Sequence, residues 1–322
     1  MDHRVLNETL HDLILAVPGM DKWPEVDELF VDADQVVRLD WQLPGIGCEA
    51  VGGAATDALP AMAALACLQV SIILVDDMLD GEPDGAHHRL GIGRTANLAL
   101  ALQAAASLLV DQCPVPAERR AAAVQALNRM ALATAAGQEL DVRNLTGEEN
   151  YWRVVRAKST PFYGAGLEVG ALLGGASRDA ADALYHVGVL FGEAIQIYDD
   201  LEDAFQSPAN SDWFQGRNNL LILYGLTADY EEKEQFLRYR AQADDPEALR
   251  RAQEILISSG GVGYCAFQLL QRHKAAREEL AGLGLPSAAR IESLLETQLR
   301  PFLRFLRSID ESLPEQFLAP IR

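Results

Sequence analysis

Two runs of aspartates are the residues in this sequence best suited to carry chemistry. The runs read VDDMLD and YDDLED and share the spacing DDxxD: Asp76, Asp77 and Asp80 in the first, Asp199, Asp200 and Asp203 in the second. On a helix, residues four apart lie on one face, so each run would present paired carboxylates in one direction. Like charges held together beside apolar chain are unfavourable unless cations neutralise them.

The donor atoms of the two runs indicate which cation they would bind. Oxygen ligands with no His or Cys among them suit a hard divalent ion, above all Mg²⁺, which keeps several waters and bridges to phosphate oxygens. A single acidic run would more often be a solvated helix end. Two runs with the same spacing, each after a long apolar segment, predict a magnesium site that holds a diphosphate.

The elements that must position these runs are predicted to be helices. Alanine and leucine are abundant, and apolar residues recur every three or four positions, which is typical of an all-α protein. Segments 58–75, 95–110 and 162–173 are apolar nearly all round, as expected of helices central to a large bundle, whereas 117–134 and 246–258 are amphipathic. The Pro- and Gly-rich stretch 44–53 predicts a break. We find no linker or repeat, and predict one domain over residues 1–322.

Composition excludes several classes of partner. The formal net charge is −20, with 27 Lys and Arg against 47 Asp and Glu, so nucleic acid and anionic lipid are not expected partners. The four cysteines form no CxxC pair, and the N-terminus lacks the form of a secretory signal, so we expect a cytoplasmic protein. Segment 58–75 reaches the lower limit for a membrane span, but Pro60, Gln69 and Ser71 favour a buried core helix, and we expect no transmembrane segment.

From about Leu59 onward the chain resembles the trans-isoprenyl diphosphate synthase, or polyprenyl synthetase, family. The resemblance is carried by both aspartate runs with their preceding helices, by GQELD at 137–141, by Lys158 followed by Ser159, and by SDWFQGRNNLLILYGL after the second run. It implies an all-α bundle of the isoprenoid synthase type with a central apolar cavity, and a homodimer. It also implies an allylic prenyl diphosphate substrate and Mg²⁺, three ions when that substrate is bound.

The resemblance also assigns roles to single residues. All six aspartates would bind metal, with Asp76, Asp80, Asp199 and Lys158 catalytic, and Lys158 and Arg217 would hold the departing diphosphate. Because water destroys an allylic carbocation, the cavity must be dry and lined by groups that tolerate positive charge. Candidates for that lining are Phe162 and Gln196, with Tyr163, Phe191 and Tyr198. Gln138 and Asp141 could orient substrate or join two helices.

The residues just before the first run bear on substrate length. The family often places a large aromatic there to stop a short product, whereas this chain has Ser71, Ile72 and Ile73. We therefore expect a C15 to C20 prenyl chain.

The sequence departs from the family where a second diphosphate, that of isopentenyl diphosphate, would bind. The family uses a glycine-lysine-arginine motif, a histidine and an arginine pair. Here residues 41–61 contain no Lys or Arg, Gln69 stands at the histidine position, and His87 and His88 stand at the arginine pair, with Arg89 and Arg94 nearby. Each lost charged contact costs roughly 1.5 to 3 kcal/mol, so the usual site looks dismantled.

Three functions fit these features. The first is prenyl transfer to an acceptor, which is isopentenyl diphosphate bound through His87, His88, Arg89 and Arg94, or another nucleophile. The second is a terpene cyclase on the same scaffold, and the third is a non-catalytic regulatory or binding subunit. The breadth of the resemblance favours prenyl transfer, and the intact aspartates argue against the third.

Overall fold

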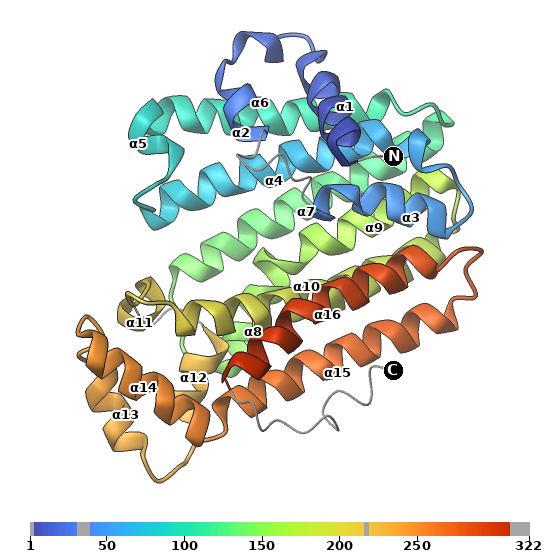
Figure 1. Ribbon diagram of the computed structural model, residues 1–322. Coiled ribbons are helices and arrows are strands. Elements are labelled where there is room, and N and C mark those ends of the chain that lie inside the picture. Colours follow the sequence, from blue (N-terminus) through green and yellow to red (C-terminus); the bar gives the residue numbers. More distant parts are fainter. Residues whose placement is uncertain (1–2, 31–38, 216–218, 310–322) are drawn as a thin grey trace.

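The computed structural model describes residues 3–30, 39–215 and 219–309, which contain helices and no strand. The all-α prediction is therefore confirmed (Figure 1). The α-helices are α1 (His3–Leu15), α2 (Glu25–Phe30), α3 (Leu43–Ala50), α4 (Leu59–Asp80), α5 (Ala86–Leu90), α6 (Ile92–Asp111), α7 (Ala117–Val142), α8 (Glu148–Lys158), α9 (Thr160–Gly174), α10 (Arg178–Phe205), α11 (Ser211–Gln215), α12 (Leu220–Thr227), α13 (Lys233–Arg240), α14 (Pro246–Ser258), α15 (Gly261–Gly282) and α16 (Ala289–Ile309). Short 3₁₀ turns are η1 (Met20–Lys22), η2 (Leu39–Gln42) and η3 (Ala55–Ala58).

Local sequence signals place the ends of α4 and α10. Pro60 stands in the first turn of α4, where its missing N–H costs nothing, and Gly81 ends the helix in the left-handed conformation with φ 66°. The α10 helix begins after Ser177, whose side chain accepts a hydrogen bond from the Ala180 N–H. The first run therefore lies at the end of α4, and the second lies in the last two turns of α10, which ends at Phe205.

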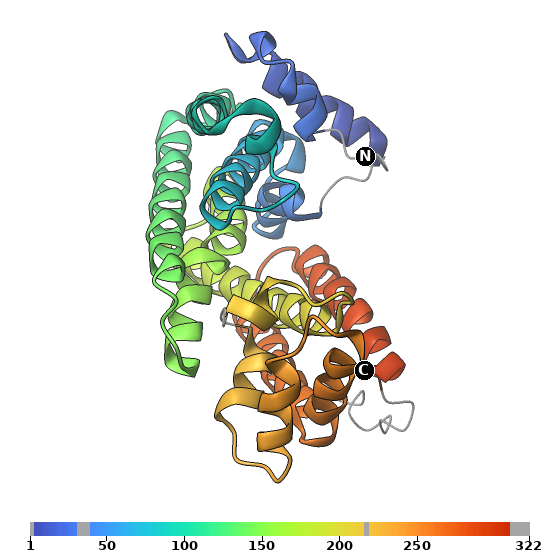
Figure 2. The same cartoon turned by 90° about the vertical axis from the view of Figure 1, so that its left-hand side faces the viewer.

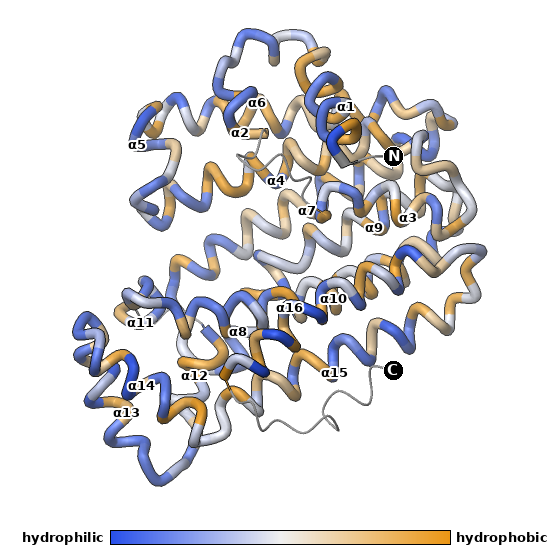
Figure 3. Tube along the Cα trace, in the orientation of Figure 1, coloured by the Kyte–Doolittle hydropathy of each residue, from blue (hydrophilic) through white to orange (hydrophobic). Residues whose placement is uncertain are grey.

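The bundle has two buried cores, and α10 contributes to both. Buried residues of its first half belong to one core with residues of α3, α4, α6, α7 and α9, and those of its second half belong to a second core with residues of α8 and of α12 to α16. Its direct neighbours include α8, α9, α12, α15 and α16. Figures 1 and 2 show α4, α9 and α10 running through the middle of the molecule. Figure 3 shows apolar residues along α4 and polar residues at the end that leads to α5.

The most apolar helix belongs to the core of this bundle. Residues 55–80 are long and apolar enough to cross a membrane, but 72% of an apolar 18-residue stretch within them is buried in the protein. One mostly buried helix of this kind is not sufficient evidence for a membrane span. Segment 58–75 lies in α4, most of which is buried, in agreement with the prediction of a core helix.

The predicted break at 44–53 is wrong, because α3 occupies its first part. Pro44 lies in the first turn, where proline is tolerated. Gly47 serves close packing instead of a turn: a Cβ on it would lie 2.4 Å from the Leu167 carbonyl oxygen, and one on Gly170 would lie 2.0 Å from the Pro44 carbonyl oxygen. The chain turns only after α3, at Gly52, which has φ 91°. The backbones of α3 and α9 therefore approach each other more closely than larger residues allow.

Buried ion pairs join the helices around the core. The Glu193 carboxylate on α10 accepts hydrogen bonds from Arg156 Nε of α8 at 2.7 Å and from Arg272 Nε of α15 at 2.8 Å. The Arg272 guanidinium also lies over the Trp152 ring, 3.9 Å from its centroid. This cluster fixes α8, and hence the following Lys158, against α10.

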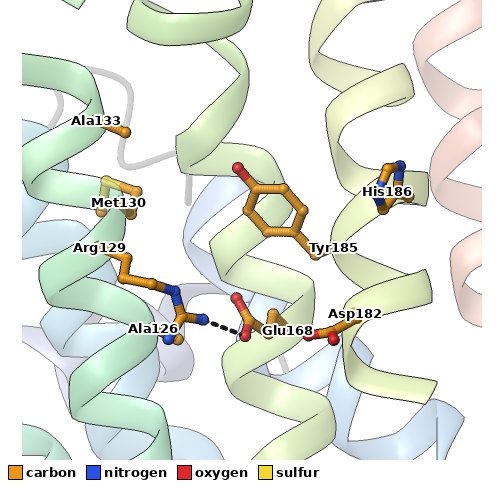
Figure 4. A pocket seen from close by; sticks show the side chains of 8 residues that line it. All are labelled: Ala126, Arg129, Met130, Ala133, Glu168, Asp182, Tyr185 and His186. Carbon is orange, nitrogen blue, oxygen red and sulfur yellow. Dashed lines mark hydrogen bonds and ion pairs between the residues drawn. The ribbon is translucent and has the colours of Figure 1, made fainter. Parts of the chain in front are cut away.

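A second buried glutamate joins α7 to α9. Glu168 accepts a hydrogen bond from Arg129 at 2.6 Å, beside a pocket of about 400 Å³ that Tyr185 and His186 of α10 also line (Figure 4). Tyr185 precedes Asp199 by about 20 Å along α10, so this pocket is separate from the aspartate runs.

We predict that Glu193→Ala lowers the free energy of unfolding by about 3 kcal/mol, because it leaves Arg272 buried without its carboxylate. The side chains of Glu193 and Arg272 are only 5% and 13% exposed. Urea or thermal unfolding measures the change. Glu254→Ala, which removes exposed pairs with Arg250 and Arg251, is the matched control and should cost less than about 1 kcal/mol. Equal losses in both variants would contradict the prediction.

Candidate active site

The ends of α4 and α10 that carry the two aspartate runs lie at the same end of the bundle (Figures 1 and 2). Polar contacts of the α8–α9 junction reach both runs. The Lys158 ammonium at the end of α8 lies 2.8 Å from Asp76 Oδ1. The next residue, Ser159, donates a hydrogen bond to Gln196 Oε1 at 2.8 Å, and Gln196 donates to Asp200 Oδ1 at 2.9 Å. The α8–α9 junction therefore bridges the end of α4 to the end of α10.

Lys158 neutralises the first run in this structure. Its Nζ lies between Asp76 Oδ1 and Asp141 Oδ2, the latter at 2.7 Å, and Gln138 donates to the same Asp76 oxygen at 3.2 Å. Burial alone would lower the pKa of Lys158, but the carboxylates of Asp76 and Asp141 outweigh it, so the pKa lies above its ordinary value. The side chain is thus a fixed cation at the mouth of the site.

Gly137 lets α7 reach this lysine. A Cβ on Gly137 would lie 2.3 Å from the Lys158 backbone nitrogen and 2.4 Å from the Ala157 carbonyl carbon. Because both atoms belong to the backbone, no side-chain rotation can relieve the overlap. The glycine in GQELD therefore brings Gln138 and Asp141 within reach of Lys158 and Asp76.

The carboxylates of Asp199 and Asp203 are hard to ionise in the metal-free protein. Burial and the neighbouring Asp200, Asp203 and Glu202 raise the pKa of Asp199 to about 7, and burial with Asp212 and Glu202 raises the pKa of Asp203 to about 6. Asp199 is nevertheless open to solvent. A cation bound beside Asp199 would favour its charged form.

Asp200 points into the protein and differs from the expected role as a metal ligand. It is 4% exposed, and both of its carboxylate oxygens accept hydrogen bonds. One oxygen accepts from Tyr151 Oη at 2.7 Å and from the Leu220 N–H at 2.8 Å, and the other accepts from Gln196. Asp200 therefore ties α8 and α12 to α10, and Asp199 and Asp203 are the residues of the second run left to face a ligand.

The donor set fits Mg²⁺ only with a shared ligand. Within the described ranges, no three His, Cys, Asp or Glu side chains surround one point closely enough to hold a metal ion. Each run instead offers carboxylate oxygens on one helix face, which leaves coordination positions for waters and phosphate oxygens, as Mg²⁺ requires. Asp76, Asp77 and Asp80 on α4, with Asp199 and Asp203 on α10, are the residues that could hold such ions.

The aromatic candidates lie in the core. Phe162 is 6% exposed and meets Tyr163 edge to face at 5.3 Å, and Tyr163 meets Phe191 at 5.5 Å. Before the first run, Ser71 is fully buried and donates to the Ala99 carbonyl oxygen of α6 at 3.0 Å, while Ile72 is half-buried. Their contact with substrate stays a prediction.

The basic residues after the first run are held by acids of α2. Arg89 Nη2 lies 2.6 Å from Glu28 Oε2, and Arg94 Nη2 lies 2.7 Å from Glu25 Oε1. His87 is buried, and its ring contacts that of His88 in a tilted arrangement, with 4.2 Å between the ring centroids. His88 Nε2 lies 3.1 Å from the Glu82 carbonyl oxygen. Arg217, the other predicted diphosphate ligand, lies outside the described residues.

Several residues of the site escaped the sequence reasoning. Tyr151, Asn219 and Trp41 each support it: Tyr151 and Asn219 bind Asp200, and the Trp41 indole donates to Gln69 Oε1 at 2.5 Å. Of the three, only Asn219 could have been recognised from the sequence, because an Asn directly before an apolar helix is a typical N-cap. Its side chain accepts hydrogen bonds from the Leu221 and Ile222 N–H groups at the start of α12.

We predict that Gly137→Ala destabilises the protein by roughly 1 to 3 kcal/mol, because the new methyl group overlaps the backbone at Lys158. Chemical unfolding measures the loss. Gly263→Ala is the matched control: a Cβ there meets nothing within 4 Å, so helix propensity should stabilise the protein by about 0.5 to 1 kcal/mol. A stabilising Gly137→Ala would refute the close approach.

We predict that Asp199→Asn stabilises the metal-free protein at pH 8 and has less than half that effect at pH 5. With a folded pKa of about 7 against an ordinary 3.8, the native state binds more protons than the unfolded state between these values, so wild-type stability falls as pH rises through that window. The variant lacks this loss. Thermal unfolding in EDTA should show a difference on the order of 1 kcal/mol at pH 8, given solvent screening. A pH-independent difference would contradict the raised pKa.

Comparisons with known proteins identify the family. A sequence model of the polyprenyl synthetase family matches residues 46–256. The geranylgeranyl diphosphate synthase of Methanosarcina mazei is 27% identical over 194 residues, which cover 55% of this chain and 60% of that protein. The geranylgeranyl pyrophosphate synthase of Geoglobus acetivorans is 25% identical over 249 residues, which cover 73% of this chain and 77% of that protein.

Solved structures share the fold across nearly the whole chain. The crystal structure of a polyprenyl synthetase from Streptomyces coelicolor matches with a TM-score of 0.76 at 22% identity and covers 93% of this chain and 97% of that one. Because the family match spans more than half of the sequence, the chain belongs to the polyprenyl synthetase family of prenyltransferases.

Proposed function

We propose that this protein is a Mg²⁺-dependent prenyltransferase that ionises an allylic prenyl diphosphate, transfers the prenyl group to an acceptor and releases diphosphate. The observation that carries the proposal is the bridge from Asp76 through Lys158, Ser159 and Gln196 to the second run. This bridge between the ends of α4 and α10 supports a site in which ions held by both runs share one diphosphate.

Different residues would bind the metal ions and the departing diphosphate when the carbon–oxygen bond breaks. Mg²⁺, when bound, stabilises the negative charge that accumulates on the leaving diphosphate. Asp76, Asp80 and Asp199 position the ions, and the Lys158 ammonium donates to the departing oxygens. Lys158 is held in place by Asp141, which keeps its pKa high, so it supplies positive charge and does not act as a base.

The prenyl tail is proposed to be C15 to C20. No aromatic residue stands at Ser71, Ile72 or Ile73. The relatives from Methanosarcina mazei and Geoglobus acetivorans are named for geranylgeranyl diphosphate, a C20 compound, which supports the upper part of this range.

Assembly and location are also proposals. Large apolar side chains stand exposed on two neighbouring helices, Leu100 and Leu108 of α6 and Leu132 of α7, at 64%, 53% and 74%. Exposed apolar surface of this kind favours a homodimer through the α6–α7 face. All four cysteines are free and buried, which supports a reducing cytoplasm.

Cyclisation is the second candidate. It requires the same ionisation but no second diphosphate, and the arginines that would bind one, Arg89 and Arg94, are already paired with glutamates. A cyclic hydrocarbon or alcohol formed from the allylic substrate alone would establish this alternative.

We predict that Asp76→Asn and Asp199→Asn each slow diphosphate release from geranylgeranyl diphosphate and Mg²⁺ by about 100-fold or more, because each removes charge that holds the ions. A coupled assay for released diphosphate measures the rate. Asp111→Asn is the control, since that side chain is 76% exposed on α6 and pairs only with Arg120 among the described contacts. Rates like the wild type in both motif variants, or release that persists in EDTA, would overturn the proposal.

A further inference from the structure

A pocket of about 560 Å³ lies directly beside the first aspartate run. Residues of α2, α4 and α5 line it, together with Trp41 of η2. Its wall on α4 is formed by Val70, Ile73, Leu74 and Asp77, which recur at three and four along one face. Asp77 adjoins Asp76, so the pocket borders the proposed diphosphate site.

Trp41 lines the pocket and is hydrogen-bonded to the face of α4 that carries Asp76. Its indole N–H donates to Gln69, and Gln69 lies two turns before Asp76 on the same face of the helix. The Trp41 ring lines the pocket as well. A molecule in the pocket would therefore contact a side chain that is hydrogen-bonded to the Asp76 face of α4.

The charges around the pocket do not suit a diphosphate. Among the described residues, Arg89 is the one lysine or arginine that lines the pocket, and Glu28, which also lines it, already holds Arg89 at 2.6 Å. Asp77 and Asp84 add further carboxylates. Arg94 offers no replacement, because Glu25 is 5% exposed and would be left buried without a partner if Arg94 turned away.

The apolar part of the pocket suits an uncharged ring. Leu29, Val70 and Leu74 line it, Ile73 is 36% exposed into it, and the rings of Trp41 and His88 provide aromatic surface. Carboxylates at the rim accept hydrogen bonds and donate none when ionised. The preferred occupant is therefore apolar and flat, and carries an N–H or O–H group.

We propose that this pocket binds the prenyl acceptor, and that the acceptor is an uncharged aromatic compound with an N–H or O–H group and no phosphate. The inference rests on the proposed function. The carbon–oxygen bond of the allylic diphosphate breaks, and its electron pair leaves with the diphosphate. A bond then forms between the allylic carbon and the aromatic ring, and the proton displaced from the ring passes to the released diphosphate.

The test supplies geranylgeranyl diphosphate and Mg²⁺ to the full chain, alone, with indole, with phenol, or with isopentenyl diphosphate. Released diphosphate and the mass of the organic product are both measured. We expect a prenylated aromatic product and no elongated diphosphate. A longer linear diphosphate formed as readily as an aromatic product would overturn the inference, as would diphosphate release without any aromatic product. In both of those cases ionisation persists and the proposed function keeps its support, whereas absence of diphosphate release in every incubation would remove the proposed function itself.

Substitution in the pocket locates the acceptor. Ile73→Arg places a bulky cation among the lining side chains and should raise the KM for the aromatic acceptor at least 10-fold. Ile92→Arg makes the same change on a side chain that is 66% exposed at the start of α6, outside the pocket, and should leave that KM unchanged. Equal KM values in the two variants would show that the acceptor binds elsewhere.

Discussion

Repulsion among carboxylates at one end of an apolar bundle is the constraint around which this protein is built. Burial and mutual proximity raise the pKa of Asp199 to about 7 and that of Asp203 to about 6, so the metal-free protein holds these groups at a cost in stability. Lys158 offsets part of that cost on the first run, between Asp76 and Asp141. Because these carboxylates repel one another, binding of divalent cations, together with a diphosphate that the cations share, is favoured.

The surrounding architecture keeps these groups in place. Gly137 admits α7 to the α8–α9 junction, Glu193 locks α8 to α10 through two arginines, and Asp200 ties α12 and α8 to α10. Each device lies within the core next to the site, so the rigidity of the scaffold and the position of Lys158 have the same physical origin. Rigid support of this kind favours ionisation, because the charges that meet the leaving group need little reorganisation.

The sequence predicted the elements better than the contacts between them. The helices that hold the runs followed from apolar periodicity, and the predicted segment 246–258 coincides with α14. The prediction of a break at 44–53 was wrong over α3 because Gly47 serves close packing against α9. No local sequence signal reveals this packing. Asp200 has the same spacing as its counterpart in the first run, yet its partners Tyr151 and Leu220 lie far away in the chain. Likewise, nothing local to Arg89 and Arg94 indicates that Glu28 and Glu25 hold them.

The central claim is that the outward carboxylates of α4 and α10 bind one diphosphate through shared metal ions. A crystal structure with a non-cleavable thiolo-diphosphate analogue of geranylgeranyl diphosphate and Mn²⁺, located by anomalous scattering, tests it most directly. The account predicts metal ions bound by Asp76 or Asp80 and by Asp199, with diphosphate oxygens between them and Lys158 in contact. Metal and diphosphate bound at only one of the two runs, or away from both, would contradict it.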